Sequence, residues 1–130
     1  MNNFFLEAHS GFRYLILIAG VLTVLYAVYG TAANRPYDKK MRILASIFAG
    51  TLHFQILLGL ALLLSGRFQP ALTGHIFMML FSAAAAQIPV SVMRRRPEEA
   101  KSYPPHGVGA LVALAFILGG VMAIGRPIIG

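Results

Sequence analysis

The sequence predicts an all-α integral membrane protein that folds as an up-down four-helix bundle. Four runs contain no Asp, Glu, Lys or Arg: residues 14–34, 43–66, 68–93 and 102–125. The shortest run has 21 positions, and a helix needs about 20 apolar residues to cross a bilayer. Charged residues make up 12% of the chain, against about 25% in soluble domains. We therefore expect a single transmembrane domain over residues 1–130.

The first helix is expected over residues 4–33. Pro36 ends it, because proline disfavours helical backbone at the preceding residue. No Lys or Arg precedes Arg13, and no small-residue cleavage site follows the first apolar run. This pattern favours a retained first helix over a secretory signal. The second helix is expected over residues 40–65 and ends at Gly66.

The third helix is expected over residues 70–93. The turn before it is short, so the second and third helices should form an antiparallel hairpin. The loop 97–105 contains three prolines and two glutamates and leads to a fourth helix over residues 106–124. The run Ser82–Ala86 has little side-chain volume. It indicates either tight helix packing, which we favour, or room for a flat cofactor.

The positive charges predict the orientation in the membrane. The net charge is +7, and eight of the eleven basic residues fall in or beside the two loops that follow the first and third helices. By the positive-inside rule, both loops face the cytoplasm and the two termini lie outside, in the periplasm of a bacterial inner-membrane protein. The same loops could contact anionic lipid headgroups. This placement argues against nucleic acid as the partner. The eight loop residues are Arg35, Lys39, Lys40, Arg42, Arg94, Arg95, Arg96 and Lys101, and the other three are Arg13, Arg67 and Arg126.

The composition excludes several kinds of chemistry. There is no cysteine, so disulfides, iron–sulfur clusters and thioether-attached haem are excluded. The four carboxylates, Glu7, Asp38, Glu98 and Glu99, all lie outside the apolar runs. We therefore assign no catalytic acid or base, and whether the chain is an enzyme stays open.

The histidines are the candidate functional residues, because one falls in or beside each predicted helix. An ionisable or metal-ligating side chain within a membrane is costly unless it has a partner, so each is a hypothesis for a functional site. Imidazoles from four helices suggest one or two non-covalent b-type haems, with histidines as iron ligands. The four candidates are His9, His53, His75 and His106.

His9 and His75 are the preferred pair of ligands. His75 lies 18 residues before Met93, about 27 Å along a helix. His9 lies four residues before Arg13, so both should sit near the outer boundary. The first and third helices are diagonal in an up-down bundle, so the two imidazoles can face each other across it. Arg13 shares the face of His9 and could bind a haem propionate; the alternative is an arginine that extends to the interface.

The other two histidines leave alternatives open. His53 lies near mid-membrane, where it either forms a hydrogen bond with Gln55 or Gln87 or contacts haem or a quinone. His106 starts the fourth helix and is either an interfacial residue or the partner of His53 on a second haem. The two depths differ by about 15–20 Å along the bilayer normal, which opposes that pairing. Met78 and Met79 follow His75 by three and four residues; we favour packing over iron ligation.

Three segments carry a family resemblance. The segments His9-Ser10-Gly11-Phe12-Arg13-Tyr14, Leu52–Gly59 and Gly74–Leu80 resemble the first three helix motifs of small four-span bacterial membrane proteins identified as cytochrome b. Here Gly74 stands where that pattern has an acidic residue, and Tyr14 where it has tryptophan. The plan is distantly similar to cytochrome b561-type proteins. The resemblance implies haem binding and electron transfer across the membrane, by analogy of fold.

Two functions follow from these observations. The first is a haem b electron-transfer protein or subunit that takes electrons from the quinone pool or from a membrane or periplasmic redox partner. The chain would then form part of a quinol-linked oxidoreductase. The second is a cofactor-free structural or regulatory subunit of a larger membrane complex, in which the histidines are hydrogen-bonded packing elements.

Overall fold

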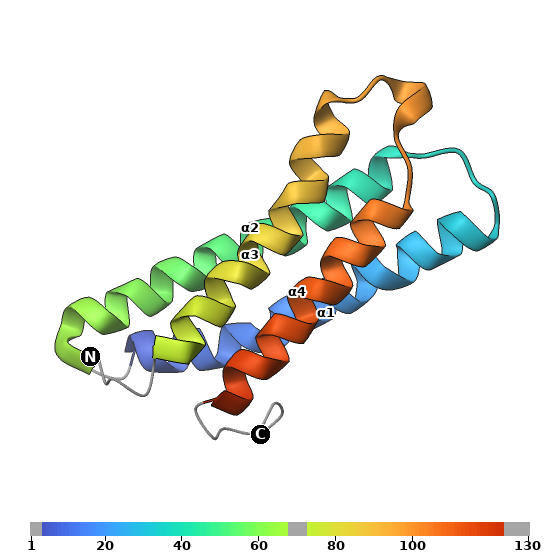
Figure 1. Cartoon of the computed structure of the whole chain (residues 1–130). Coiled ribbons are helices and arrows are strands. Elements are labelled where there is room, and N and C mark those ends of the chain that lie inside the picture. Colours follow the sequence, from blue (N-terminus) through green and yellow to red (C-terminus); the bar gives the residue numbers. More distant parts are fainter. Residues whose placement is uncertain (1–3, 68–72, 124–130) are drawn as a thin grey trace.

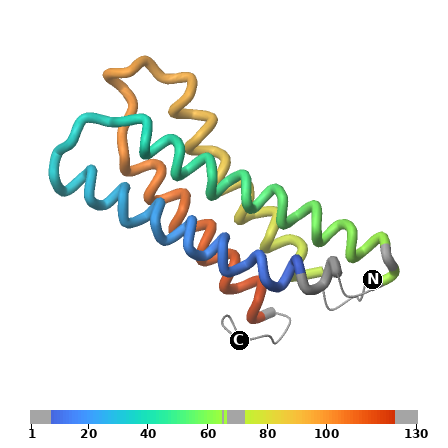
Figure 2. Tube along the Cα trace, turned by 180° about the vertical axis from the view of Figure 1, so that it is seen from behind, coloured from blue at the N-terminus to red at the C-terminus, as the bar shows by residue number. Residues whose placement is uncertain are grey.

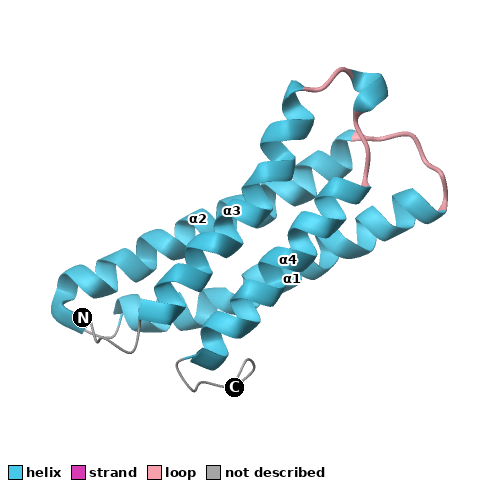
Figure 3. Cartoon of the chain, viewed as in Figure 1, coloured by secondary structure: helices cyan, strands magenta, loops and turns pink. Residues whose placement is uncertain are grey.

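Four long helices form the protein. The computed structural model describes residues 4–67 and 73–123, which hold α1 (Phe4–Ala32), α2 (Lys39–Leu62), α3 (Thr73–Arg95) and α4 (Pro104–Ala123) (Figures 1 and 3). A π-helical turn, η1 (Leu63–Arg67), follows α2, and a 3₁₀ turn, η3 (Glu98–Ala100), follows α3. Within these two ranges there is no strand. The prediction of an all-α fold is therefore confirmed.

The surface of the bundle is apolar along all four helices. Each helix contains a stretch of at least 19 residues that is long and apolar enough to cross a bilayer. Large apolar side chains face outward; Leu25 is 58% exposed and Leu57 is 60% exposed. Soluble monomers rarely expose contiguous apolar surface of this extent. The chain is a multi-pass membrane protein, and its outward apolar side chains face lipid.

The helix limits differ slightly from those expected. α2 begins one residue earlier than predicted, where the Asp38 carboxylate caps it by accepting a hydrogen bond of 3.1 Å from the Met41 amide. α2 ends at Leu62, three residues before the predicted end, and η1 follows it; Gly66 in η1 has a φ of 88°, in the left-handed region that favours glycine. α3 extends to Arg95 and α4 begins at Pro104. The predicted start of the third helix at residue 70 and the predicted end of the fourth at residue 124 lie outside the described residues.

Neighbouring helices run in opposite directions, and α1 and α3 form one diagonal of the bundle. α1 packs along α2 and α4, and α3 packs along α4 and α2, so α1 and α3 lie diagonally across the bundle (Figures 1 and 2). The α1–α2 and α3–α4 loops meet at one end, which we call the His106 end. The start of α1 and the end of α4 lie at the opposite end, the His9 end.

Small residues fill the centre of the bundle. The buried core includes Ala49, Ala83, Ala86, Ala110 and Ala113. Small side chains allow helix backbones to approach closely in a membrane, where dispersion contacts replace the hydrophobic effect between helices. The segment Ser82–Ala86 contributes two of these alanines, which favours tight packing as the role of that segment.

α3 and α4 pack closely against each other at Pro89. Pro89 lies inside α3 and cannot donate a backbone hydrogen bond to the Ala85 carbonyl. Gly109 of α4 lies against this position, and a Cβ atom built on Gly109 would come within 2.4 Å of Pro89 Cγ and 2.7 Å of the Ala85 oxygen. The missing side chain of Gly109 therefore lets α4 pack directly onto the proline-containing turn of α3.

Gly109→Ala is expected to lower the melting temperature, since its methyl group would overlap Pro89 and the Ala85 carbonyl. Overpacking of this kind costs about 1–3 kcal/mol. Gly50→Ala is the matched control, because a Cβ atom at Gly50 would meet nothing within 4 Å and alanine favours a helix by about 1 kcal/mol. Thermal unfolding in detergent, followed by circular dichroism, measures both. Equal melting temperatures would contradict the close α3–α4 contact.

Candidate functional site

His9 and His75 meet at the His9 end of the bundle. Their ring centroids lie 6.3 Å apart, and the ring planes are inclined by 82°. His9 comes from α1 and His75 from the first turn of α3, so the diagonal helices bring them together. Both side chains are half-buried. We call this arrangement the His9–His75 site.

A hydrogen bond across the bundle fixes the tautomer of His75. Its Nδ1 atom lies 2.9 Å from the carbonyl oxygen of Gly120 on α4. Because a carbonyl only accepts, Nδ1 must carry the proton and donate it, and the Nε2 atom of the neutral ring keeps its lone pair. Such a bond from the second ring nitrogen is the usual support for a metal-ligating histidine. Gly74 leaves no acidic neighbour, and α4 supplies the support instead.

Gln55 holds the backbone of α1 at His9. Its Nε2 atom donates a hydrogen bond of 2.6 Å to the His9 carbonyl oxygen. Gln55 is only 6% exposed, and its Oε1 atom is buried with no hydrogen-bond partner among the described residues. The sequence suggested Gln55 or Gln87 as a hydrogen-bond partner of His53. In the structure, Gln55 forms its hydrogen bond with the backbone of His9 instead.

Glycines lie beside both rings of the site. A Cβ atom on Gly59 of α2 would lie 3.4 Å from His9 Cε1, and one on Gly120 would lie 3.5 Å from His75 Nδ1. Met79 packs onto Gly120, where an added Cβ would come within 2.5 Å of its terminal methyl group. This contact supports packing as the role of Met79. The glycines therefore give the two imidazoles their space between the helices.

Arg13 lies one helical turn after His9 on α1 and is half-buried. Its Nη2 atom donates a hydrogen bond of 2.9 Å to the Tyr14 hydroxyl, and its guanidinium group lies 4.9 Å from the centre of the Tyr14 ring. Arg13 thus places a cation within one turn of the His9–His75 site. The aromatic ring of Tyr14 stacks with that cation.

His53 faces the outer surface of the bundle. Its side chain is exposed on α2, and its Nε2 atom lies 3.0 Å from Gln87 Oε1 on α3. Gln87 in turn donates a hydrogen bond of 2.9 Å to the Ser91 hydroxyl. Because the Gln87 oxygen only accepts, His53 Nε2 donates and the Nδ1 lone pair remains. Of the two glutamines suggested by the sequence, Gln87 is therefore the partner.

His106 belongs to a polar aromatic cluster at the other end of the bundle. It is 1% exposed, its Nε2 atom is 2.8 Å from the Tyr37 hydroxyl, and its ring stacks on Tyr37. The Tyr103 hydroxyl donates a hydrogen bond of 2.8 Å to the Pro36 carbonyl. These two bonds tie the α1–α2 loop to the first turn of α4 and to the α3–α4 loop. His106 Nδ1 is buried without a hydrogen-bond partner in the described part of the chain.

The structure does not bring His53 and His106 together. His106 contacts Tyr37, which precedes α2, whereas His53 lies 14 residues after Lys39 at the start of that helix. That separation corresponds to about 21 Å along the helix axis. The two rings contact different partners at different depths, whereas the rings of His9 and His75 contact each other.

Asp38 provides the negative charge of the cluster. Its carboxylate accepts hydrogen bonds from the Tyr26 hydroxyl and the Met41 amide, and it forms an ion pair with Arg35 at 3.4 Å. Burial alone would raise the pKa of Asp38, but these three donors together lower the pKa below its ordinary value. Burial also raises the pKa of Tyr37. Sequence analysis missed this cluster. Its four tyrosines lie close to the two loops and are Tyr26, Tyr29, Tyr37 and Tyr103.

The donor set limits the kind of metal centre. Across residues 4–67 and 73–123, no three His, Cys, Asp or Glu side chains gather where they could hold a bare metal ion. A haem needs only one or two axial ligands from the protein, because the porphyrin supplies the other four nitrogens.

Comparison with known proteins found no matching family model, curated protein or solved structure.

Tyr37→Phe is expected to lower the melting temperature, because it leaves a buried imidazole with no partner on either nitrogen. An unsatisfied buried polar group costs about 1–3 kcal/mol. Tyr29→Phe is the control, since Tyr29 is 51% exposed and its hydroxyl accepts a hydrogen bond from Arg35 at the surface. If thermal unfolding in detergent shows the two variants to be equally stable, the Tyr37–His106 bond does not stabilise the loops.

Acid is expected to destabilise the cluster through Asp38. Because its folded pKa lies below the ordinary value of 3.8, the carboxylate stabilises the fold above that pH, and the stabilisation is lost as the pH falls through the folded pKa. The melting temperature should therefore drop in strongly acidic buffer. Asp38→Asn should flatten that part of the pH profile, and an unchanged acid profile would show that Asp38 has no such role.

Proposed function

We propose that the chain binds one b-type haem between His9 and His75 and acts as a membrane electron-transfer protein or subunit linked to the quinone pool. The observation that carries the proposal is the pairing of two imidazoles from diagonal helices, with their ring centroids 6.3 Å apart. Two imidazoles that share a metal through bonds of about 2.0–2.1 Å have centroids roughly 6 Å apart. The spacing of the two rings fits a shared iron.

The residues around the pair fit the roles that such a group requires. His9 and His75 would hold the iron, and the Gly120 carbonyl orients His75 by accepting a hydrogen bond from its Nδ1 atom. Gln55 fixes the depth of His9 through its hydrogen bond to the α1 backbone. Arg13 would pair with a propionate carboxylate, for which a guanidinium is well suited. A bound haem supplies one-electron redox chemistry, which the side chains of this protein cannot supply.

A single haem per chain is the proposed stoichiometry. His53 donates to Gln87 on the outer surface, and His106 is packed on Tyr37 at the opposite end. Neither ring faces another imidazole. We therefore assign His53 and His106 to hydrogen bonding within the fold and not to a second iron centre.

The charge distribution supports an orientation. The His106 end carries both loops and eight of the basic residues. We propose that this end faces the cytoplasm of a bacterial cell, according to the positive-inside rule. The His9–His75 site would then lie near the periplasmic surface of the inner membrane, within reach of a periplasmic redox partner.

A second function, as a subunit of a larger membrane complex, is favoured by His53. An exposed imidazole is costly in hydrocarbon unless it has a partner, and His53 has only its Gln87 bond among the described residues. Its Nδ1 lone pair could accept a hydrogen bond from a neighbouring transmembrane helix. Purification in a mild detergent tests this alternative. A chain that stays monomeric, with and without His53→Ala, would contradict it.

Haem content tests the proposed function. Protein expressed with added haem should show sharp α and Soret bands on dithionite reduction, with one haem per chain. His75→Ala should lose nearly all of the haem, because the two remaining histidines besides His9 contact Gln87 and Tyr37 instead. His53→Ala is the matched control and should retain it, since its ring faces outward. Full haem content in His75→Ala, or no haem in the unaltered protein, would refute the proposal.

A further inference from the structure

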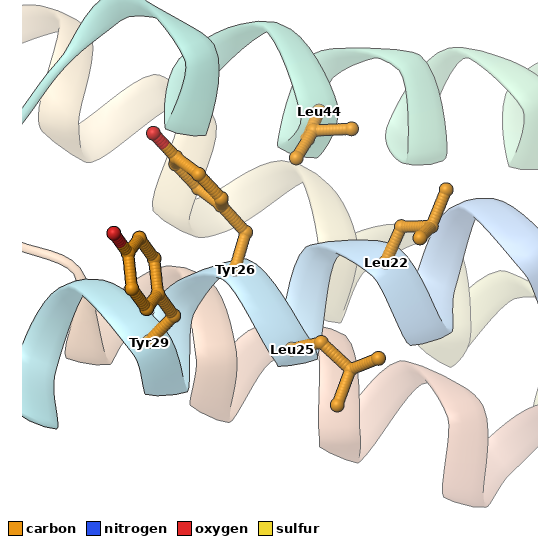
Figure 4. Close-up of a pocket in the computed structure, with 5 residues that line it drawn as sticks. All are labelled: Leu22, Leu25, Tyr26, Tyr29 and Leu44. Atoms are coloured by element: carbon orange, nitrogen blue, oxygen red, sulfur yellow. The ribbon is translucent and has the colours of Figure 1, made fainter.

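An apolar groove lies between α1 and α2 near the His106 end. Its volume is about 330 Å³, and it is lined by Leu22, Leu25, Tyr26, Tyr29 and Leu44. Figure 4 shows Leu22 and Tyr26 extending from α1 toward Leu44 on α2, with both tyrosine hydroxyl groups on the side of the α1–α2 loop.

The groove opens to the surroundings of the bundle. Leu22, Leu25 and Tyr29 on its rim are 47%, 58% and 51% exposed, and these side chains lie on helices that span the membrane. Its occupant must therefore come from the bilayer and must present a hydrocarbon segment to the leucines. The floor offers no charged group.

Cations surround the loop end of the same groove. Arg35 donates a hydrogen bond of 3.2 Å to the Tyr29 hydroxyl, and its side chain is 40% exposed. Lys40 lies one helical turn before Leu44 and so shares its face of α2. Lys39 and Lys40 are exposed, and no ion pair is recorded for either in the described ranges. With Arg42 and the Asp38 carboxylate, the segment 33–42 has a net charge of +3, four cations minus one anion.

We propose that this groove binds one acyl chain of an anionic phospholipid, whose phosphate contacts Arg35 and Lys40. The leucines supply the apolar channel for the chain. The Tyr29 hydroxyl accepts from Arg35, and its own proton is available for a phosphate oxygen. Tyrosines are common at the depth of lipid headgroups, where the ring is apolar and the hydroxyl is hydrated. The proposal is independent of haem binding and concerns the opposite end of the bundle.

The absence of tryptophan from the chain allows a site-specific test. Leu25→Trp places a single fluorophore on the exposed rim of the groove. The variant is reconstituted in vesicles of equimolar phosphatidylglycerol and phosphatidylcholine, in which one lipid or the other is brominated and quenches fluorescence on contact. Leu57→Trp, on an exposed part of α2 beyond the groove residues, is the control reporter. The proposal predicts several-fold stronger quenching by brominated phosphatidylglycerol at Leu25→Trp and equal quenching by both lipids at Leu57→Trp.

Charge variants separate a site from a diffuse surface layer. Lys39→Gln with Lys40→Gln, added to Leu25→Trp, should abolish most of the preference, because one basic residue at an anionic surface changes lipid binding by about fivefold. Arg94→Gln with Arg95→Gln removes the same charge at the end of α3 and should leave the preference unchanged. Equal effects of the two pairs would overturn the proposal. Equal quenching by both lipids at Leu25→Trp, or displacement of both by an added quinone, would also overturn it.

Discussion

In the hydrocarbon interior of a membrane, a polar side chain is stable only where another group satisfies its hydrogen bonds. This constraint determines how the bundle is organised around its imidazoles. Three of the four imidazoles form a hydrogen bond with a partner from a different helix or loop, so the polar groups cross-link the bundle. The pairs are His75 with the Gly120 carbonyl, His53 with Gln87, and His106 with Tyr37.

The packing of α4 on α3 connects this constraint to function. Gly109 brings the two backbones together at Pro89, and one consequence is that a backbone carbonyl near the end of α4 comes within reach of a ring on the first turn of α3. The carbonyl of Gly120 then fixes which nitrogen of His75 carries the proton. A contact between helices therefore leaves the second nitrogen of His75 without a proton, as the proposed haem site requires. The two ends of the bundle differ in consequence, with paired imidazoles at one end and a polar aromatic cluster with basic loops at the other.

The sequence predicted the number, type and approximate limits of the helices, because hydropathy and charge are local properties of a segment. It also placed His9 and His75 at one depth, since depth depends only on the rise per residue. The partners could not be predicted in the same way. Gly120 as the acceptor for His75 depends on how α3 and α4 are rotated against each other, and the bond between Tyr37 and His106 depends on how two loops fold back on the bundle. The exposure of His53 likewise depends on helix rotation, which depth alone does not determine.

The electron paramagnetic resonance spectrum of the oxidised, haem-loaded protein tests the central claim most directly, because it reports the axial ligands of the iron and the relative orientation of their rings. Two imidazole ligands predict a low-spin ferric signal, and ring planes inclined by 82° predict the highly anisotropic form that near-perpendicular ligands produce. A high-spin signal would mean that one of the two histidines does not bind the iron. In that case the pairing of His9 with His75 would be a packing contact and not a haem site.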